Sequence, residues 1–425
     1  MSIKTRLKKS PMTWARFLGI LQTDGCISWS FDKDKAFHPK IIISITGKRP
    51  EFINQIADFL KDHGLKVQIS NETFTPEGKS ERAVNLTIER MDQCQKLINY
   101  IDKLNTDPFP ISLVDQKKFD YEILKKIFEL NKLRKKAKTE SEKAAICSQI
   151  ADLKEVFHQE KVGHKHKDKQ EFFNIFRIKN TSYTPGLAET IISDIEDNVR
   201  NISDQMVKLS QNFTTIADIP EPLGEFLAGV FNGDGSFQID LISHVNEDGS
   251  PQFANPTDPK RTPWRRPFFE IRPEITLTLK GKSRFGNLIF NIAFNILELP
   301  KTKQTSQKNE PTIVDVGDNK DATRLCIRRK GVLKDSVIPF FERFCPSFDR
   351  ALNRFRIFRV AVNNDELIRN RVERAKYIVK LIYQHSDFGP ENRKRTETEY
   401  LALIEKEFKY QFNQKSDQKS DQKLN

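Results

Sequence analysis

The spacing of apolar residues predicts alternating helices and strands over the first hundred residues. Helices are expected where apolar positions recur on one face, at 12–24, 51–62 and 91–104. Strands are expected where apolar and polar residues alternate, at about 26–31, 40–46, 65–71 and 82–89. Charged or polar segments that are typical of hairpin turns separate the strands of each pair. The order is therefore helix, hairpin, helix, hairpin, helix.

The same order recurs from about residue 221. A helix at 222–234 precedes strands at 236–242 and 271–280, which are joined by a long connection rich in Pro, Asp and Arg. The elements predicted after them are a helix at 284–297, strands near 312–316 and 323–329, and a helix at 332–344. An internal repeat of an αββαββα unit predicts an α+β protein built from two pseudo-symmetric halves.

Two segments lie outside the repeat. Helical patterning between the halves covers 115–138, 141–160 and 187–209, and amphipathic stretches at 364–384 and 394–411 follow the second half. The terminal QKSDQKSDQKLN is polar and has nothing to bury, so we expect it to be disordered. The predicted division is 1–109 (first half), 110–217 (helical insert), 218–362 (second half) and 363–425 (C-terminal helices and tail).

The chain is strongly basic. Of its 425 residues, 71 are Lys or Arg and 58 are Asp or Glu, which gives a formal net charge of +13. Such an excess favours a polyanionic partner, because neutralising phosphates releases condensed counterions. A merely soluble basic protein is equally consistent with the charge alone. Hydrophobic residues make up 37% of the chain, enough for a packed core, which excludes a disordered polycation.

Several features bear on where the protein is found. No apolar run approaches the roughly 20 residues that span a bilayer, and the basic N-terminus lacks the apolar stretch of a secretory signal. The 5 cysteines show no CxxC spacing and are typical of reduced thiols, so we expect an intracellular protein. Phe outnumbers Tyr 32 to 7, as A/T-rich codons would produce, which leaves a mitochondrion or chloroplast open.

Each half opens with a helix that carries small residues four positions apart. In the first helix these are Ala15, Gly19 and Thr23, and in the second they are Gly229 and Gly233. Positions i and i+4 share a helical face, so each helix presents a flat stripe that another backbone can approach closely. We expect the two helices to pack against each other through these stripes.

Both helices end in Asp followed by Gly, at Asp24-Gly25 and Asp234-Gly235. The glycines are expected to form left-handed C-caps. A carboxylate at the negative end of a helix dipole is disfavoured by about 0.3–1 kcal/mol, and packing the stripes together would bring two such carboxylates close. A divalent metal ion offsets the repulsion, and carboxylates that share metal ions perform phosphodiester hydrolysis. An ordinary turn explains one such helix end, whereas two in register favour a functional site.

These two segments resemble the signature helices of a LAGLIDADG homing endonuclease in its single-chain, two-motif form. The second segment, LAGVFNGDG at 227–235, is close to the pattern, whereas the first, FLGILQTDG at 17–25, has Leu18 where the pattern has Ala. The resemblance covers about 10–130 and 220–362. It implies two αββαββα halves that form a saddle-shaped DNA-binding sheet. It also implies site-specific cleavage of both strands of duplex DNA, the reaction of intron homing.

The resemblance assigns the metal site to the two helix ends. It implies two or three Mg²⁺ ions shared by the carboxylates of Asp24 and Asp234, with the backbone carbonyls of Thr23 and Gly233 assisting. The earlier acidic position of the pattern holds Gln22 in the first motif and Asn232 in the second. Because that position does not bind the metal, both substitutions leave cleavage possible.

The resemblance also implies residues around the reacting phosphate. The polar residue that usually orders water falls at Gly47 and Gly281, where this chain departs from the pattern. A basic residue near the scissile phosphate is implied at Lys117 in the first half and at Arg350 in the second. A solvated side chain on a helix is the alternative for each of these two.

DNA-facing side chains are expected at every second position of the strands that follow each catalytic Asp. In the first half these are Ser28, Ser30, Asp32, Lys40 and Ser44, and in the second they are Gln238, Asp240, Arg272, Glu274, Thr276 and Thr278. Basic and aromatic residues interleave in the long connection of the second half. There Arg261, Arg265 and Arg266 are expected to contact phosphates or flanking bases.

Two other functions stay open at this point. An RNA maturase of the same fold would bind its group I intron and assist splicing, a role that would suit the helical insert. A non-cleaving DNA-binding protein would need neither catalytic Asp. The histidines His158, His164 and His166 lack a Cys or carboxylate pair at suitable spacing, so no zinc is expected there. With both motifs in one chain, we expect a monomer.

Overall fold

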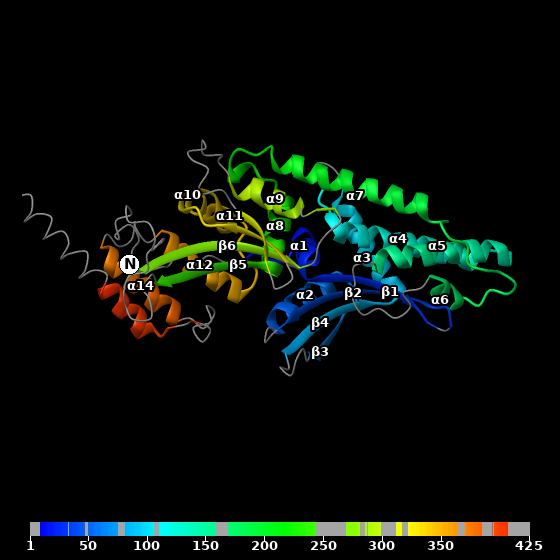
Figure 1. Ribbon diagram of the computed structural model, residues 1–425, viewed down its shortest axis with the longest axis horizontal. Coiled ribbons are helices and arrows are strands. Elements are labelled where there is room, and N and C mark those ends of the chain that lie inside the picture. The colour runs from blue at the N-terminus through cyan, green and yellow to red at the C-terminus, as the bar shows by residue number, and fades with distance from the viewer. Residues whose placement is uncertain are drawn as a thin grey trace, which may run out of the picture.

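The computed structural model describes residues 9–32, 34–46, 50–74, 81–105, 110–158, 169–243, 269–280, 285–286, 288–298, 312–316, 322–363, 370–384, 393 and 395–406. Two antiparallel sheets lie on either side of a central helix pair, α1 and α8 (Figure 1). Each sheet belongs to one of the two predicted halves. The internal repeat is therefore confirmed.

The first half begins with α1 (Trp14–Asp24), which passes directly into β1 (Gly25–Phe31). The elements that follow are β2 (Phe37–Thr46), α2 (Pro50–Asp62), β3 (Gln68–Phe74), β4 (Glu81–Glu89) and α3 (Met91–Leu104). The four strands pair in the order β1-β2-β4-β3, and every pair is antiparallel.

The second half repeats this arrangement from α8 (Glu221–Asp234), which passes directly into β5 (Gly235–Ser243). Its other elements are β6 (Phe269–Lys280), α9 (Leu288–Leu297), β7 (Thr312–Val316), β8 (Ala322–Ile327), α10 (Lys330–Val332), the π-helical turn η3 (Leu333–Val337) and α11 (Ile338–Arg343). The strand order β5-β6-β8-β7 matches that of the first half.

The alternating strands form sheets with one packed face, as their sequences predict. In β1 the side chains of Ile27, Trp29 and Phe31 are buried, whereas the intervening positions are more exposed. In β5 the same alternation buries the residues at 237, 239 and 241. Because successive strand residues point to opposite faces, the polar residues of both strands lie on the other face.

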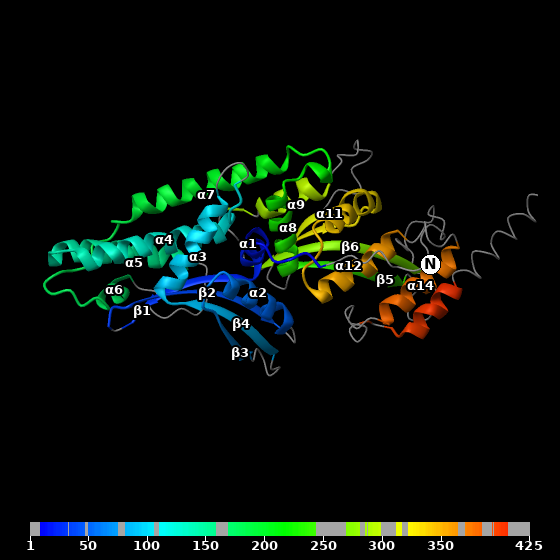
Figure 2. The same cartoon turned by 180° about the vertical axis from the view of Figure 1, so that it is seen from behind.

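Four helices form the insert between the halves: α4 (Asp115–Lys136), α5 (Glu140–His158), α6 (Lys169–Asn174) and α7 (Glu189–Ser210). A short 3₁₀ turn, η1 (Ile216–Asp218), leads into α8. The helices α4 and α5 lie side by side, and α7 packs against both α4 and α9 (Figure 2). The helix α7 therefore contacts both halves of the molecule.

The second half ends with α12 (Asp349–Val362), and helices at α14 (Arg371–Tyr383) and residues 397–406 follow it. The helix α12 packs against β5, as α4 packs against β1 in the first half. The tail after residue 406 and most of the long connection before β6 lie outside the described residues.

One predicted element differs in kind from the observed one. The sequence predicts a single helix over 332–344, but α10 and α11 are separated there by the π turn η3. Pro339 stands at the start of α11 and has no backbone N–H, so an α-helical hydrogen bond is missing at this point. A π turn is one of the few ways a helix accommodates such a local interruption.

Candidate active site

The helices α1 and α8 pack through their small residues. A Cβ atom added at Gly19 would lie 2.7 Å from the backbone nitrogen of Val230 and 2.9 Å from the Cα of Gly229. A Cβ at Gly229 would in turn lie 3.0 Å from the Cα of Gly19. Real Cβ atoms essentially never come closer than 3.0 Å to a neighbour, so only glycines allow this approach. The predicted packing of the two stripes is confirmed.

This packing brings the two acidic helix ends together. A Cβ at Gly233 would lie 3.0 Å from the Cβ of Thr23 and 3.1 Å from Oδ2 of Asp24. The carboxylate of Asp24 therefore lies against the residue that precedes Asp234 in the chain. Both carboxylates stand at the C-terminal ends of their helices, where the backbone carbonyls make the local potential negative.

The glycines after these residues do not form the predicted left-handed caps. Gly25 has φ −78° and ψ 143°, and Gly235 has φ −84° and ψ 151°, both extended. The reason for glycine is close approach rather than positive φ. A Cβ at Gly235 would lie 2.5 Å from Cδ1 and 2.6 Å from Cα of Phe231, so no side chain fits where the strand turns back onto the helix.

The structure places Lys117 at the end of α1. Its Nζ donates a hydrogen bond to the backbone carbonyl of Gly25, the residue that follows Asp24. Lys117 is the third residue of α4, and α4 itself packs against β1. A cation from the insert is thus fixed one residue away from the first carboxylate.

The structure places Arg350 at the start of α12. It is the second residue of α12, and the third residue, which corresponds to Lys117 of α4, is Ala351. Arg350 is only partly buried, and its role stays a prediction.

Gln22 is a site residue that sequence reasoning missed. Its side-chain amide accepts a hydrogen bond from the backbone N–H of Val114 (3.0 Å) and donates one to the carbonyl of Val114 (3.3 Å). Val114 is the residue immediately before α4, so Gln22 fixes the start of the helix that carries Lys117. Its only sequence signal is an amide at a motif position that does not bind metal.

The equivalent residue Asn232 is one methylene shorter than Gln22. Its side-chain nitrogen, Nδ2, is buried and has no hydrogen-bond partner among the described residues. The two halves differ here as well, because only the first half has this two-bond amide link to the helix that follows it.

A buried ion pair joins the other ends of α1 and α8. Arg16 is fully buried, and it donates to Glu225 through Nε (2.6 Å) and Nη2 (2.9 Å). Its Nη1 also donates to the carbonyl of Cys345 (2.6 Å) and to the hydroxyl of Ser347. A planar guanidinium suits such a bidentate contact. This cluster ties the helix pair to the segment that precedes α12.

The first-half residues predicted to face DNA share one surface. Ser28 pairs with Lys40 across β1 and β2, Ser30 pairs with His38, and their side chains are half-buried or exposed. Asp32 accepts a hydrogen bond from His38 at 2.8 Å, which lowers the pKa of this carboxyl. Lys40 forms an ion pair with Glu89, with 2.9 Å between Nζ and Oε1. The side chain of Ser44 is exposed.

The second-half residues also share one face, but two of them are buried on it. Glu274 is 3% exposed and is covered by its ion-pair partner Arg328, and Thr276 is 2% exposed and accepts a hydrogen bond from Gln238 at 3.3 Å. Arg272 lies opposite Asp240, and Thr278 accepts a hydrogen bond from Arg324 at 3.1 Å. This face is a connected polar network rather than a row of projecting side chains.

One carboxyl in this network titrates abnormally. Desolvation, followed by the nearby charge of Glu274, raises the pKa of Asp240 above its ordinary value. The guanidinium groups of Arg328, Arg272 and Arg393 act in the opposite direction. The electrostatics of this face are therefore set by residues from β5, β6 and the C-terminal segment together.

Several predicted residues lie outside the described residues: Gly47, Gly281, His164, His166, Arg261, Arg265 and Arg266. In the described part of the chain, no three His, Cys, Asp or Glu residues are grouped so that they could hold a metal ion. A search of the same residues for membrane spans finds no helix with the length and hydropathy to cross a bilayer.

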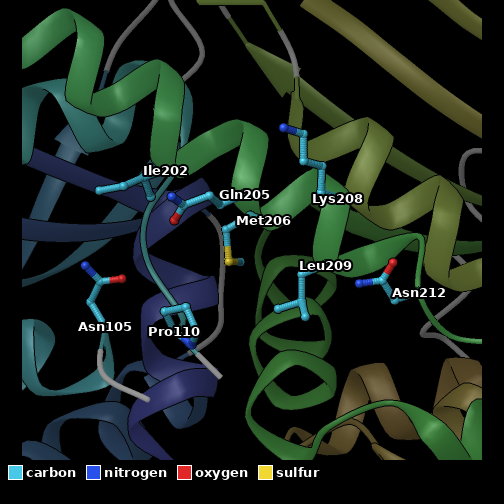
Figure 3. Close-up of a pocket in the computed structure, with 8 residues that line it drawn as sticks. All are labelled: Asn105, Pro110, Ile202, Gln205, Met206, Lys208, Leu209 and Asn212. Carbon is cyan, nitrogen blue, oxygen red and sulfur yellow. The ribbon is translucent and has the colours of Figure 1, made fainter. Parts of the chain in front are cut away.

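A surface cavity of about 290 Å³ lies between α7 and the segment that follows α3 (Figure 3). Its apolar lining comes from Pro110, Ile202, Met206 and Leu209. The polar groups around it are Asn105, Gln205, Lys208 and Asn212. None of these lining residues is acidic, so the cavity takes no part in the carboxylate site.

Comparisons by sequence give no match, either to a protein-family model or to a curated protein. Solved structures do match. The LAGLIDADG homing endonuclease I-GzeII, in complex with a DNA target, has a TM-score of 0.53 and 14% identity, over 89% of this chain and 100% of that one. The LAGLIDADG meganuclease I-CpaMI, bound to uncleaved DNA, has a TM-score of 0.51 and 14% identity, over 87% and 98%.

The LAGLIDADG homing endonuclease I-SmaMI, bound to cleaved DNA, has a TM-score of 0.52 and 15% identity, over 88% of this chain and 97% of that one. These matches span nearly the whole of both molecules, so they include both halves and the helix pair between them. The two antiparallel sheets, their identical strand orders and the closely packed α1–α8 pair agree with that architecture. The chain has the fold of the LAGLIDADG homing endonucleases.

Proposed function

We propose that this chain is a site-specific endonuclease that cuts both strands of duplex DNA, with one carboxylate from each half. The observation that carries the proposal is the glycine-mediated packing of α1 and α8, which sets Asp24 against the residue before Asp234. Two acidic side chains at the negative ends of adjacent helices are unfavourable in an apo protein. Their retention at equivalent positions of two halves favours a functional reason.

The donor atoms at this site fit a hard divalent cation such as Mg²⁺. Carboxylate and backbone carbonyl oxygens are the ligands that Mg²⁺ prefers, and here Asp24, Asp234 and the carbonyls of Thr23 and Gly233 would supply them. A divalent ion bound there supplies a water of lowered pKa and stabilises the negative charge on the phosphodiester oxygens. The positive charge also removes the repulsion between the carboxylates.

The chain's own residues position the substrate around this pair. Lys117 is held by its bond to the Gly25 carbonyl, so its ammonium can approach a phosphate oxygen beside Asp24. Gln22 maintains that position by fixing the start of α4. Loss of the Lys117–Gly25 bond or of the Gln22–Val114 bonds would displace the Lys117 ammonium and leave the two carboxylates in place.

The polar faces of the two sheets would hold the duplex on either side of the carboxylates. Ser28, Ser30 and Lys40 lie on one face of the first sheet, and Gln238 and Arg272 lie on one face of the second. Polar side chains on such a face can reach base edges in the major groove. Solved structures of the same fold are in complex with DNA, which supports duplex DNA as the partner. Because each half supplies one carboxylate, we propose that a monomer is sufficient, and that intron homing is the biological role.

Cleavage of a randomised duplex library tests the proposal without knowledge of the target. The full chain is incubated with the library in Mg²⁺ or in EDTA, and the newly formed ends are sequenced. We expect double-strand ends from one family of related sequences, in Mg²⁺ only. Specific binding without new ends would contradict cleavage and support a DNA-binding protein. Retention of structured intron RNA in place of duplex DNA would support the RNA maturase.

A further inference from the structure

The first hairpin of each half extends beyond the other strands of its sheet. In the ladder between β2 and β4, pairing runs from Lys40 to Thr46, so Phe37, His38 and Pro39 pair with β1 alone. In the ladder between β6 and β8, pairing starts at Ile275, so residues 269–274 pair with β5 alone. The distal half of each hairpin is therefore a two-stranded ribbon. An isolated two-stranded ribbon is only marginally stable in water.

Helices of the insert pack under the first ribbon. Its inner-face aromatic residues are Trp29, Phe31 and Phe37, all buried. Ring centroids lie 5.7 Å apart for Trp29 and Phe157 of α5, 5.9 Å for Trp29 and Phe172 of α6, 5.1 Å for Phe31 and Phe176, and 5.1 Å for Phe37 and Phe128 of α4. These aromatic contacts give the ribbon a hydrophobic core that its own sheet does not provide.

Two cations of the insert complete these contacts. Lys154 of α5 is buried, its Nζ donates to the Trp29 carbonyl at 3.1 Å, and it stands 4.5 Å from the Trp29 ring centroid. Arg134 of α4 donates to the Lys35 carbonyl at 2.8 Å, in the turn of the hairpin. Because β1 is the edge strand of its sheet, the carbonyl of Trp29 needs a donor from outside the ladder.

The C-terminal segment makes the same kind of contact with the second ribbon. The Tyr400 hydroxyl donates to the carbonyl of Leu241, and Arg393 donates to the carbonyl of Ile239, both at 3.3 Å. Like β1, β5 is an edge strand, so these are again edge carbonyls. The ring of Tyr400 lies 6.3 Å from that of Tyr383 at the end of α14.

The two supporting segments have no common position in the repeat. One is inserted between the halves and the other follows the second half, yet each lies at the far end of a long hairpin. In Figure 1 and Figure 2, α5 and α6 lie at the β1 end of the long axis, and α14 lies at the β5 end. We call α5, α6 and Phe176 the first brace, and α14, Arg393 and Tyr400 the second brace.

We propose that the two braces hold the distal ribbons in place over duplex DNA and thereby set discrimination at the outer base pairs of each half-site. This inference rests on the proposed endonuclease function. At about 3.3 Å per residue, a seven-residue strand such as β1 spans the length of roughly seven base pairs. Residues near Asp24 then face the centre of the target, and residues near Phe31 face its outer part.

The test compares variants of each brace in the full chain. Phe176→Ala removes the ring against Phe31, and Tyr400→Phe removes only the hydroxyl that binds the Leu241 carbonyl. Phe173→Ala is the matched control, because Phe173 is equally buried in α6 but its ring lies 6.0 Å from Tyr183 rather than on the ribbon. A folded control shows that the loss of a Phe from α6 is tolerated.

Hydrogen exchange without DNA gives the first readout. We expect amides at 29–31 and 37–38 to exchange roughly tenfold faster or more in Phe176→Ala, and amides at 239–241 to exchange faster in Tyr400→Phe. The Phe173→Ala control should leave both sets unchanged. Unchanged exchange in both brace variants would overturn the braces whether or not the chain cleaves DNA.

Cleavage of duplexes with single base-pair substitutions gives the second readout. The parent duplex is the sequence that the unmodified chain cuts from a randomised library. We expect each brace variant to lose roughly tenfold discrimination at the outer pairs of its own half-site, and to keep discrimination at the central pairs. A uniform loss of discrimination at all positions would overturn the proposal that the braces act on the outer base pairs. A library that yields no cut sequence would contradict the proposed endonuclease function. It would also overturn the proposal that the braces set discrimination at the outer base pairs.

Discussion

Substitution of Gly19 by Ala tests whether close helix packing holds the two carboxylates at one site. The added Cβ would meet three backbone atoms of α8: the carbonyl oxygen of Phe226, the nitrogen of Val230 at 2.7 Å and the Cα of Gly229 at 2.9 Å. Backbone atoms cannot rotate away as a side chain can. The nitrogen contact alone must grow from 2.7 Å to about 3.4 Å, where ordinary contact begins. The Phe226 oxygen lies closer still to the added Cβ, so the helices must separate by more than this difference.

Two consequences follow from this separation. Overpacking of this size typically costs about 1–3 kcal/mol of unfolding free energy. The separation also moves Asp24 relative to Asp234 by about 1 Å, and a misplacement of this size can lower the rate of an enzyme by about 10²-fold. We therefore expect Gly19→Ala to lose most of its cleavage activity while it remains folded and binds the selected duplex.

Urea unfolding and single-turnover cleavage of the selected duplex measure the two effects. Gly331→Ala is the matched control, because the nearest atom to its added Cβ is Oδ2 of Asp335 at 3.8 Å. That helical position has room, so Ala there should stabilise the fold by about 0.4–1 kcal/mol. A Gly19→Ala chain with the stability and cleavage rate of the parent would refute the packing argument.

Three further variants probe the charges around the site. Asn in place of Asp24 and Asp234 together should abolish cleavage and, in EDTA, raise the unfolding free energy by about 0.3–1 kcal/mol per helix end, since each carboxylate opposes its helix dipole. Lys117→Ala should lower the single-turnover rate, with duplex affinity in Ca²⁺ little changed, because its contact is to the Gly25 carbonyl beside Asp24. Burial raises the pKa of the Asp115 carboxyl to about 7, from its ordinary value of 3.8. Between pH 4 and pH 7, roughly, the Asp115 carboxyl therefore keeps its proton in the folded state and has lost it in the unfolded state. Stability should fall as pH rises from about 4 to about 7, by up to about 4 kcal/mol, and Asp115→Asn should flatten this dependence.

The outcomes that contradict these expectations are distinct. A double Asn variant that is less stable in EDTA would show that the carboxylates do not oppose the helix dipoles. A Lys117→Ala chain that cleaves at the parental rate would leave that residue a structural role. Equal pH dependence of urea unfolding in the parent and in Asp115→Asn would place the titration elsewhere.

Much of the fold follows from local sequence patterns. The order of helices and strands, the repeat and the small-residue stripes on α1 and α8 depend on periodicities of two and about four residues, which are visible along the chain. The prediction of left-handed caps at Gly25 and Gly235 was wrong, because a glycine is also required where backbones approach closely. At Gly235 the competing cause is the Phe231 ring and backbone, a contact that no local pattern reveals.

Other parts of the site depend on contacts between distant segments. The hydrogen bonds from Gln22 to Val114 and from Lys117 to Gly25 each cross about ninety residues of sequence, and nothing in the local pattern pairs them. Glu274 was predicted to face DNA from its alternation, and the structure places it on the same face as Gln238 and Thr276. Its burial under Arg328 of a neighbouring segment could not be predicted from alternation alone.

Cleavage of a supercoiled plasmid that carries the selected duplex tests the central claim most directly, that two helix-end carboxylates form one site. We expect the unmodified chain to convert the plasmid to its linear form in Mg²⁺. The Asp24→Asn and Asp234→Asn double variant should leave the plasmid supercoiled although it still binds the duplex. Linear product from that double variant, at the rate of the parent, would contradict the account.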